Sequence, residues 1–388
     1  MSPVSSKLAA AAGLLAMIPS ALAGFSSSSS SNIAVYWGQN SANGANTQQR
    51  LSYSITANNG IDVIPIAFMT GINTLSVNFA SASNDCTTAS NGLLICPEIE
   101  ADIKTCQANG KTIMLSIGGA TYSEGGFSSA SAAQSAAKTV WDLFGSPTST
   151  ANRPFGTAVI DGFDLDLESS NSNFDSFAAE MRTLMATDTS KTYYLSAAPQ
   201  CPYPDAAVGY VLSSSTKFDF VNVQFYNNYC GVNDYPTNFN FDTWDSWAKS
   251  SANPNAKVLL GVPASASAAG SGYVSSSQLA TIISNVKQYS SFGGLMMWDM
   301  SQLYANSGYL AAAVSALGGS GGTTTTMVTS TKTSSPTSTK TTSTATPTGT
   351  GVGPYDQCGG TGYTGSTVCQ SGYVCTEISS AWSQCDPA

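Results

Sequence analysis

Eight short runs rich in β-branched and aromatic residues recur between residues 25 and 317, and longer segments suited to helices alternate with them. Such alternation predicts a parallel sheet with right-handed crossovers. Eight repeats over about 290 residues fit a closed (β/α)8 TIM barrel. An open doubly wound sheet is the alternative, but no Gly-rich phosphate loop supports it. The expected strands are Ile33–Tyr36, Val63–Phe68, Thr112–Ile117, Ala158–Glu168, Tyr193–Ala197, Phe220–Tyr226, Lys257–Val262 and Gly294–Trp298.

The segments outside the barrel have distinct compositions. The apolar run Leu8–Ile18 follows Lys7 and precedes Ala21-Leu22-Ala23, which is typical of a secretory signal peptide. A membrane anchor needs about 20 apolar residues, more than this run has. Residues 323–350 hold 20 Ser or Thr in 28 positions, a composition typical of an extended linker. We therefore expect a signal peptide at 1–23, a barrel at 25–317, a linker at 318–353 and a small cysteine-rich module at 354–388, in a secreted, extracellular or wall-associated protein.

The composition narrows the chemistry that this chain can perform. It contains no histidine, which removes Ser-His-Asp and Cys-His nucleophiles and leaves carboxylates as the acid/base groups. Its formal net charge is −9, so nucleic-acid backbones and anionic lipid surfaces repel it. We expect no nucleic-acid partner, no membrane partner and a monomer. A neutral polymer is the better candidate for a substrate.

Three acidic residues in the fourth expected strand carry the strongest functional signal. Side chains alternate along a strand, so Asp164, Asp166 and Glu168 share one face. Acids are poor strand formers, and several on one face are costly unless they have a task. In a barrel this face points inward, with Glu168 at the C-terminal mouth where barrel enzymes react. Crowded carboxylates raise at least one pKa, which keeps a proton available for acid catalysis.

Three other interpretations of these acids compete with catalysis. A solvent-facing strand edge could tolerate them, but the preceding apolar residues Ala158-Val159-Ile160 favour burial. A calcium or magnesium loop usually carries Gly and carbonyl ligands in a sharp turn. Coupled structural acids without activity are the third alternative. We favour catalysis, with no metal and no cofactor.

The segment Asp161–Glu168 matches the DxxDxDxE signature of glycoside hydrolase family 18, the chitinases. Further motifs in order resemble the plant-type, class III (hevamine-like) branch and its fungal relatives. They are Ile33–Asn40, Leu115–Gly119, Ala197–Pro202, Val223–Asn228 and Gly293–Trp298.

The resemblance implies a retaining mechanism in which the acetamido group of the substrate is the nucleophile. Glu168 would then protonate the glycosidic oxygen and later activate water. Asp166 would stabilise the oxazolinium ion, Asp164 would modulate Asp166, and Tyr226 would donate to the acetamido oxygen. The resemblance leaves the role of Asp161 open between catalysis and a purely structural role.

Four further residues lie at expected C-terminal strand ends, where one rim can hold a sugar. Aromatic rings stack on pyranose faces, and amides satisfy hydroxyl and acetamido groups. The interval between the last two strands leaves no room for an extra domain, so we expect an open groove and endo cleavage. These expected substrate-binding residues are Tyr36, Gln224, Asn228 and Trp298.

The expected signal peptide places the nine cysteines in an oxidising compartment. The resemblance pairs Cys201 with Cys230 and Cys86 with Cys96. Cys106 is then left over. Either Cys106 is a buried free thiol, which we favour, or the Cys86–Cys96 pairing is wrong.

The C-terminal segment resembles carbohydrate-binding module family 1, a fungal wedge that lies on crystalline cellulose or chitin. So short a module needs staples. The family pattern pairs Cys358 with Cys375 and Cys369 with Cys385. Ala381 replaces a usual aromatic ring, which we expect to weaken adsorption by about 1 to 3 kcal/mol. The implied binding face consists of Tyr355, Trp382, Tyr363 and Gln384.

The leading function is therefore a secreted endochitinase acting on β-1,4-linked N-acetylglucosamine polymers, with chitin or a related polysaccharide as its partner. A chitin-binding lectin on the same barrel would usually lack the acid, whereas Glu168 is present. An endo-N-acetylglucosaminidase on N-linked glycans is the other alternative, and it would prefer soluble glycoprotein.

Overall fold

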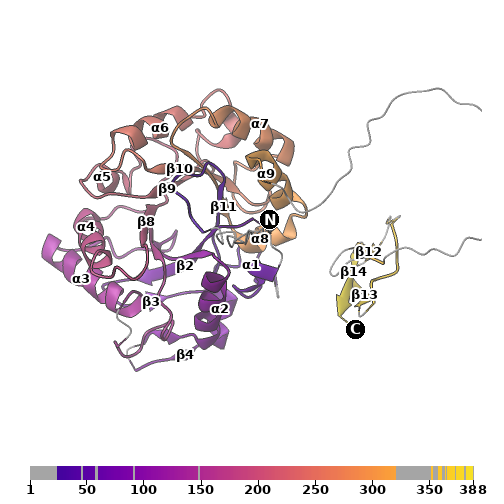
Figure 1. Cartoon of the computed structure of the whole chain (residues 1–388), viewed down its shortest axis with the longest axis horizontal. Coiled ribbons are helices and arrows are strands. Elements are labelled where there is room, and N and C mark those ends of the chain that lie inside the picture. Colours follow the sequence, from indigo (N-terminus) through magenta and orange to yellow (C-terminus); the bar gives the residue numbers. More distant parts are fainter. Residues whose placement is uncertain are drawn as a thin grey trace, which may run out of the picture. The chain divides into compact units, whose positions relative to one another are not determined.

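The computed structural model describes residues 24–44, 47–56, 60–90, 92–146, 149–319, 351–352, 357–360, 363, 365–371, 373–379 and 382–387. The chain divides into two compact units, residues 1–323 and residues 324–388 (Figure 1). The expected signal peptide and almost all of the expected linker lie outside the described residues. Among the described residues, every helix is too short or too polar to cross a bilayer.

The larger unit is a closed barrel of eight parallel strands. Their order is β1-β11-β10-β9-β8-β7-β6-β2, and a β1–β2 pairing closes the ring. A short strand, β3, adds antiparallel to β2. The predicted TIM barrel is therefore correct. The barrel strands are β1 (Asn32–Val35), β2 (Val63–Gly71), β6 (Thr112–Gly118), β7 (Gly162–Asp166), β8 (Tyr194–Ala197), β9 (Phe220–Gln224), β10 (Lys257–Pro263) and β11 (Phe292–Trp298), with β3 at Ser76–Val77.

Helices surround the barrel and bury its outer face (Figure 1). Local signals fix their starts: Ser129 accepts the Ala132 backbone N–H, and Ser275 forms a capping box with Gln278. The helices are α1 (Tyr53–Thr56), α2 (Pro97–Ala108), α3 (Ala130–Phe144), α4 (Phe174–Met185), α5 (Gly209–Leu212), α6 (Phe241–Ser250), α7 (Ser276–Val286), α8 (Met300–Ala305) and α9 (Tyr309–Leu317). Two 3₁₀ turns, Ala80–Asp85 and Val232–Asp234, and a hairpin of β4 (Thr87–Thr88) and β5 (Leu94–Ile95) occupy the loops.

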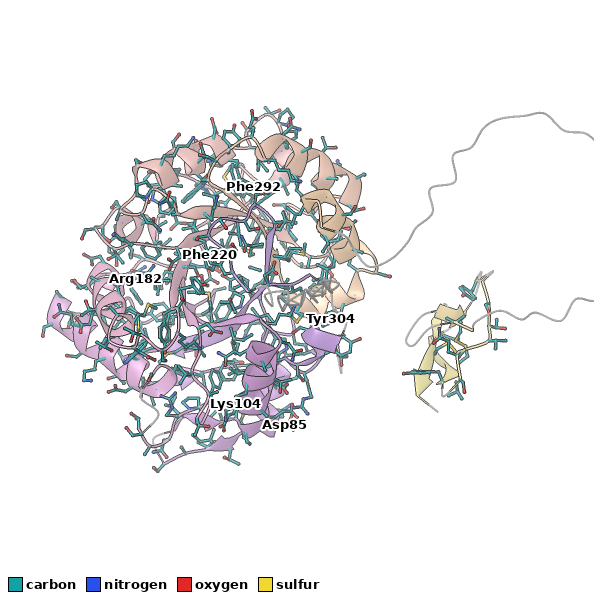
Figure 2. All side chains as sticks on the ribbon, in the orientation of Figure 1. Asp85, Lys104, Arg182, Phe220, Phe292 and Tyr304 are labelled. Atoms are coloured by element: carbon teal, nitrogen blue, oxygen red, sulfur yellow. A yellow bond between two sulfur atoms is a disulfide. The ribbon has the colours of Figure 1, made fainter. Side chains whose placement is uncertain are left out.

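Apolar side chains pack on both sides of the strand ring. Phe220 points inside it, where its ring lies 4.4 Å from that of Phe25, whereas Phe292 points outward onto Phe241 of α6 at 5.8 Å (Figure 2). All four side chains are buried. The interior is therefore packed at its base, and open space is left only toward the carboxyl ends of the strands.

The expected strand Ala158–Glu168 is too long at both ends, because β7 covers only Gly162–Asp166. Before the strand, the Ala158 carbonyl accepts from the buried Arg153 guanidinium instead of a neighbouring strand. At the last residue of the strand, the Asp166 carbonyl accepts from the Gly119 backbone N–H at 2.7 Å. Glu168 therefore lies two residues beyond the strand end, at the mouth of the barrel.

The smaller unit has three antiparallel strands in the order β12-β14-β13. Two disulfides link Cys358 to Cys375 and Cys369 to Cys385. These cross-links stabilise a fold that is too small to have a sufficient hydrophobic core. The strands are β12 (Gln357–Gly359), β13 (Tyr373–Ser379) and β14 (Trp382–Pro387).

Candidate active site

The acidic strand β7 presents its alternate side chains to opposite layers of the fold. Phe163 and Leu165 are buried against the helices, whereas Asp164 and Asp166 point into the barrel and are also buried. Glu168, past the strand end, lines the cavity that opens there. In the part of the chain that the structure describes, none of these three acids belongs to an ion pair.

Neutral donors from four other strands or strand ends of the barrel solvate Asp164. Its Oδ2 accepts from the Tyr36 hydroxyl at 2.7 Å and from the Ser116 hydroxyl at 2.7 Å. Its Oδ1 accepts from the Ser196 hydroxyl at 2.6 Å, and the Asn222 amide lies at 3.4 Å. These donors replace the water that burial removes, so a buried carboxylate becomes tolerable without a cation.

Gln224 orients the carboxylate of Asp166 through a hydrogen bond. Its Nε2 donates to Asp166 Oδ1 at 3.0 Å and to the carbonyl oxygen of Ala198 at 3.0 Å. Asp166 thus receives far fewer hydrogen bonds than Asp164 does. The close approach of strands here requires glycine at Gly118, whose φ is +117° and where a Cβ would lie 2.1 Å from the Asp166 carbonyl oxygen.

The pKa values of the three acids rise together. Burial is the main cause at Asp166, whose pKa lies well above its usual range, and the charges of Glu168 and Asp164 add to it. Burial also raises the pKa of Glu168, with hydrogen bonding from Gln224 opposing the rise. For Asp164, burial raises the pKa and the hydroxyl donors partly offset it. The Asp166–Glu168 pair therefore shares protons at a pH where isolated carboxyls have lost them.

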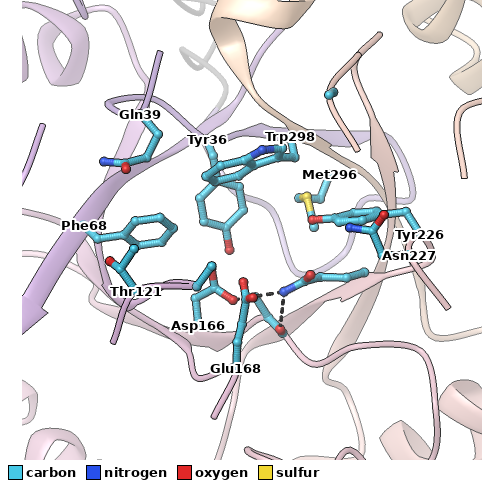
Figure 3. Close-up of a pocket in the computed structure, with 14 residues that line it drawn as sticks. Tyr36, Gln39, Phe68, Thr121, Asp166, Glu168, Tyr226, Asn227, Met296 and Trp298 are labelled. Carbon is cyan, nitrogen blue, oxygen red and sulfur yellow. Dashed lines mark hydrogen bonds between the residues drawn. The ribbon is translucent and has the colours of Figure 1, made fainter. Parts of the chain in front are cut away.

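Asp166 and Glu168 line a cavity of about 210 Å³ at the carboxyl ends of the strands (Figure 3). Its aromatic wall consists of Phe68, Tyr36 and Trp298, and the Phe68 and Trp298 rings stack at 5.8 Å with an 18° interplanar angle. Tyr226 lies across the cavity from Phe68. A ring wall facing carboxylates suits a ligand with an apolar face and polar edges.

Most residues predicted from the sequence meet at this cavity. Glu168, Asp166, Tyr226, Tyr36, Gln224 and Trp298 line it, and Asp164 lies directly behind Asp166 and Tyr36.

Asn228 is an exception, because it is not among the lining residues. Its amide donates to Gln200 Oε1 at 3.0 Å, and the neighbouring Asn227 lines the cavity instead. The strand β9 ends at Gln224 and Asn227 has a positive φ of 57°, so the chain turns before it reaches Asn228.

Asp161 lies at the opposite end of β7 and serves the fold. Its carboxylate accepts the Ile113 backbone N–H at 2.7 Å and the Gln107 amide at 2.9 Å, and it pairs with Lys191.

Sequence reasoning missed the residues that support Asp164 and complete the wall. Ser116, Ser196 and Asn222 point inward from β6, β8 and β9, and the alternation of each strand could have identified them. Phe68 and Met296 also line the cavity. They look like ordinary core residues in the sequence, and only closure of the ring brings them to the site.

In the barrel, disulfides join Cys86 to Cys96 and Cys201 to Cys230, and Cys106 is a buried free thiol. Among the described residues, one group of three potential metal ligands has suitable spacing, Cys358, Cys369 and Cys375. All three sulfurs are in disulfides and have no thiolate to offer a metal.

Of the expected binding face of the small module, Tyr355 and the side chains of Trp382 and Gln384 lie outside the description. Tyr363 is described, and its hydroxyl donates to the Ser366 carbonyl at 3.2 Å.

Comparison with known proteins assigns both units. The model of "Glycosyl hydrolases family 18" matches residues 32–274. The chain belongs to glycosyl hydrolase family 18. The model of "Fungal cellulose binding domain" matches residues 354–382 of this family 18 protein.

Three relatives illustrate the similarity. Endochitinase 33 of Trichoderma harzianum is 53% identical over 320 residues, covering 80% of this chain and 99% of its own. A class III chitinase of Arthroderma benhamiae is 45% identical over 319 residues, covering 78% and 91%. The crystal structure of ICChI chitinase from Ipomoea carnea has a TM-score of 0.62 at 28% identity, covering 74% and 98%.

The raised pKa of Asp166 makes a prediction about the stability of this family 18 barrel. When folding raises the pKa of a carboxyl group, that group contributes most to the free energy of unfolding at a pH below its unfolded-state pKa. The contribution is lost as the pH rises through the folded-state pKa. Asp166→Asn mimics the neutral form and can still accept from Gln224. We expect it to raise the free energy of unfolding at pH 7 by about 0.5–2 kcal/mol, with the gain shrinking as pH falls toward 4.

Urea denaturation at several pH values measures this difference. Asp161→Asn is the matched control, because it removes the ion pair with Lys191 and should lower stability at pH 7. A loss of stability in both variants would contradict the assignment of Asp166 as the destabilising acid.

Proposed function

We propose that this protein is a secreted endochitinase that hydrolyses β-1,4 linkages between N-acetylglucosamine units with retention of configuration. The observation that carries the proposal is the buried Asp164–Asp166 pair leading to Glu168 in a cavity with an aromatic wall. Two relatives that match most of this chain are named an endochitinase and a class III chitinase. The comparison therefore supports the same polymer as substrate.

Glu168 is the proton donor in this scheme. Burial raises its pKa, so it holds a proton near the pH at which the reaction runs. The proton passes to the glycosidic oxygen as the bond from that oxygen to C1 breaks. The acetamido oxygen of the same sugar attacks C1 and forms the oxazolinium ion. The rate should fall as pH rises through the elevated pKa of Glu168.

The second step returns the protein to its starting state. Glu168, now ionised, takes a proton from water, whose oxygen attacks C1 and opens the oxazolinium ring. Two displacements at C1 on opposite faces leave the product with the configuration of the substrate.

The remaining polar groups stabilise the charge that develops on the sugar. Asp166 would accept from the acetamido N–H and face the positive ring, and Gln224 fixes its orientation through the 3.0 Å hydrogen bond. Asp164 lies behind it and modulates its charge, and Tyr36, Ser116 and Ser196 hold Asp164 in place. Burial and the neighbouring acids raise the pKa of Tyr226 well above its usual value. Tyr226 therefore stays protonated and can donate to the acetamido oxygen.

The loops around the cavity favour cleavage within a chain. Between β10 and β11 the fold has the helix α7 and no additional domain. A polymer can thus cross the barrel mouth without being threaded through a tunnel. The terminal module, which matches the fungal cellulose binding domain, would hold the enzyme on an insoluble surface and raise the local substrate concentration.

Replacing the proposed acid should stop turnover and spare binding. Glu168→Gln keeps the size and the Gln224 contact but has no proton to give. We expect kcat on chitin oligomers to fall by about 10³-fold or more, while oligomer affinity stays within a few-fold. Glu98→Gln, on the exposed surface of α2, is the control and should keep full activity. Undiminished turnover by Glu168→Gln would remove Glu168 as the acid.

Substrate assistance predicts the anomer that forms first. Digestion of N-acetylglucosamine oligomers, followed by proton NMR within the first minutes, should show the β-anomer before mutarotation. Initial release of the α-anomer would reject the retaining scheme, even if chitin proves to be the substrate.

Removing the small unit should affect the degradation of solid chitin and not the cleavage of soluble oligomers. A chain ended after Leu317 should cleave soluble oligomers at the parent rate and degrade solid chitin several-fold more slowly, because adsorption raises the effective concentration of the polymer. Equal degradation of solid chitin by both chains would show that the module does not serve adsorption to this surface.

A further inference from the structure

A second hollow, of about 430 Å³, lies on the barrel unit away from the catalytic cavity. The loop after β8 and the helices α5 and α6 form its walls, and these helices lie on the outside of the barrel (Figure 1). Two tyrosine rings in it are well exposed, Tyr203 at 47% and Tyr210 at 38%. Large exposed aromatic groups gathered at one concave place mark a binding surface more often than chance.

The two tryptophans of the hollow are buried and have no spare N–H groups. Trp244 Nε1 donates to the Cys201 carbonyl at 3.0 Å, and Trp247 Nε1 donates to the Leu212 carbonyl at 3.3 Å. The Tyr203 ring stands at 87° to that of Trp244, with centroids 5.3 Å apart. Trp244 is fully buried, so the exposed rings of Tyr203 and Tyr210 are the aromatic surfaces that face the space.

Tyr203 is held in place by fewer contacts than Tyr210. Among the described residues, its hydroxyl forms no hydrogen bond and its ring contact is with Trp244 alone. Tyr210, by contrast, donates to Asn171 Oδ1 at 2.7 Å and accepts the Phe174 backbone N–H at 2.9 Å. Tyr203 is thus a free platform beside a fixed one.

The polar groups of the hollow favour a neutral ligand. Asp205 is its one charged lining residue among those described, and its two oxygens accept backbone N–H groups of Gln200, Ala207 and Val208. With no cation in the lining and a net charge of −9 on the chain, anions are repelled. Apolar faces with a hydroxyl rim fit a pyranose ring.

The hollow and the catalytic cavity share one loop. Ala198 lines the cavity and Tyr203 lines the hollow, so their Cα atoms, five residues apart, are separated by at most about 18 Å. Between them, Gln200 pairs with Gln224, the residue that holds Asp166. A polymer surface that occupies the cavity is therefore within reach of the hollow.

We propose that this hollow is a second saccharide-binding site, which takes a segment of the same β-1,4-linked N-acetylglucosamine polymer and holds it on the Tyr203 ring. The choice of sugar rests on the proposed function, whereas the existence of the site rests on the hollow itself. Two linked contacts with one surface slow its departure from the catalytic cavity.

The test uses the full chain carrying Glu168→Gln, titrated with the N-acetylglucosamine trisaccharide in a calorimeter. Adding Tyr203→Ala should remove one binding event per chain, or weaken it about tenfold or more, as expected for one lost stacking ring. Tyr203→Phe keeps the ring and should bind as the parent does. Ser213→Arg, which fills the hollow from its exposed rim, should have the same effect as Tyr203→Ala.

Unchanged stoichiometry and affinity in both Tyr203→Ala and Ser213→Arg would overturn the proposal. So would a loss of affinity confined to the catalytic cavity, because Tyr203 would then belong to that site. Thermal unfolding midpoints within a few degrees of the parent verify that both variants are folded.

Activity distinguishes this failure from failure of the proposed function. With Glu168 present, Tyr203→Ala should cleave the trisaccharide at the parent rate and degrade solid chitin several-fold more slowly. A parent enzyme that cleaves neither substrate would refute the proposed function. The calorimetric titration would then still show whether the hollow binds the saccharide.

Discussion

The structure depends on keeping two carboxylates buried inside a barrel without a cation beside them. Asp164 is surrounded by hydroxyl and amide donors from Tyr36, Ser116, Ser196 and Asn222. Such donors supply the solvation that water would give, and they fix the direction of each oxygen. A cation would lower the pKa values of all three acids. Among the described residues no Lys or Arg pairs with these acids, and burial raises their pKa values.

The rest of the site follows from this arrangement. Asp166 has one side-chain donor, Gln224, and burial together with the charges of Glu168 and Asp164 raises its pKa well above its usual range. Glu168 lies outside the buried row, at the cavity, where a substrate can reach its proton. The segment from Asp164 to Glu168 thus holds three acids with different tasks, because the depth of burial changes along it.

Sequence patterns predicted much of this arrangement. Eight alternating runs gave the barrel, and the two-residue alternation of Asp164, Asp166 and Glu168 gave their common face. Asn228 was expected at a strand end, but the chain turns at Asn227, which has a positive φ, and Asn227 lines the cavity. Strand limits were also wrong where side chains such as Arg153 satisfy the backbone outside the ladder. Local patterns cannot include such long-range partners.

The sequence by itself determined the chemistry available to the protein: carboxylates in the absence of histidine, arranged on one strand face, and cysteines that staple a small second unit. Only the tertiary structure decided which neutral groups meet those carboxylates. Ser116, Ser196 and Asn222 come from three other strands, and Phe68 reaches Trp298 only because β1 closes the ring between β2 and β11. Closure of the ring sets these contacts, and the separation of the residues along the chain hides them from any local pattern.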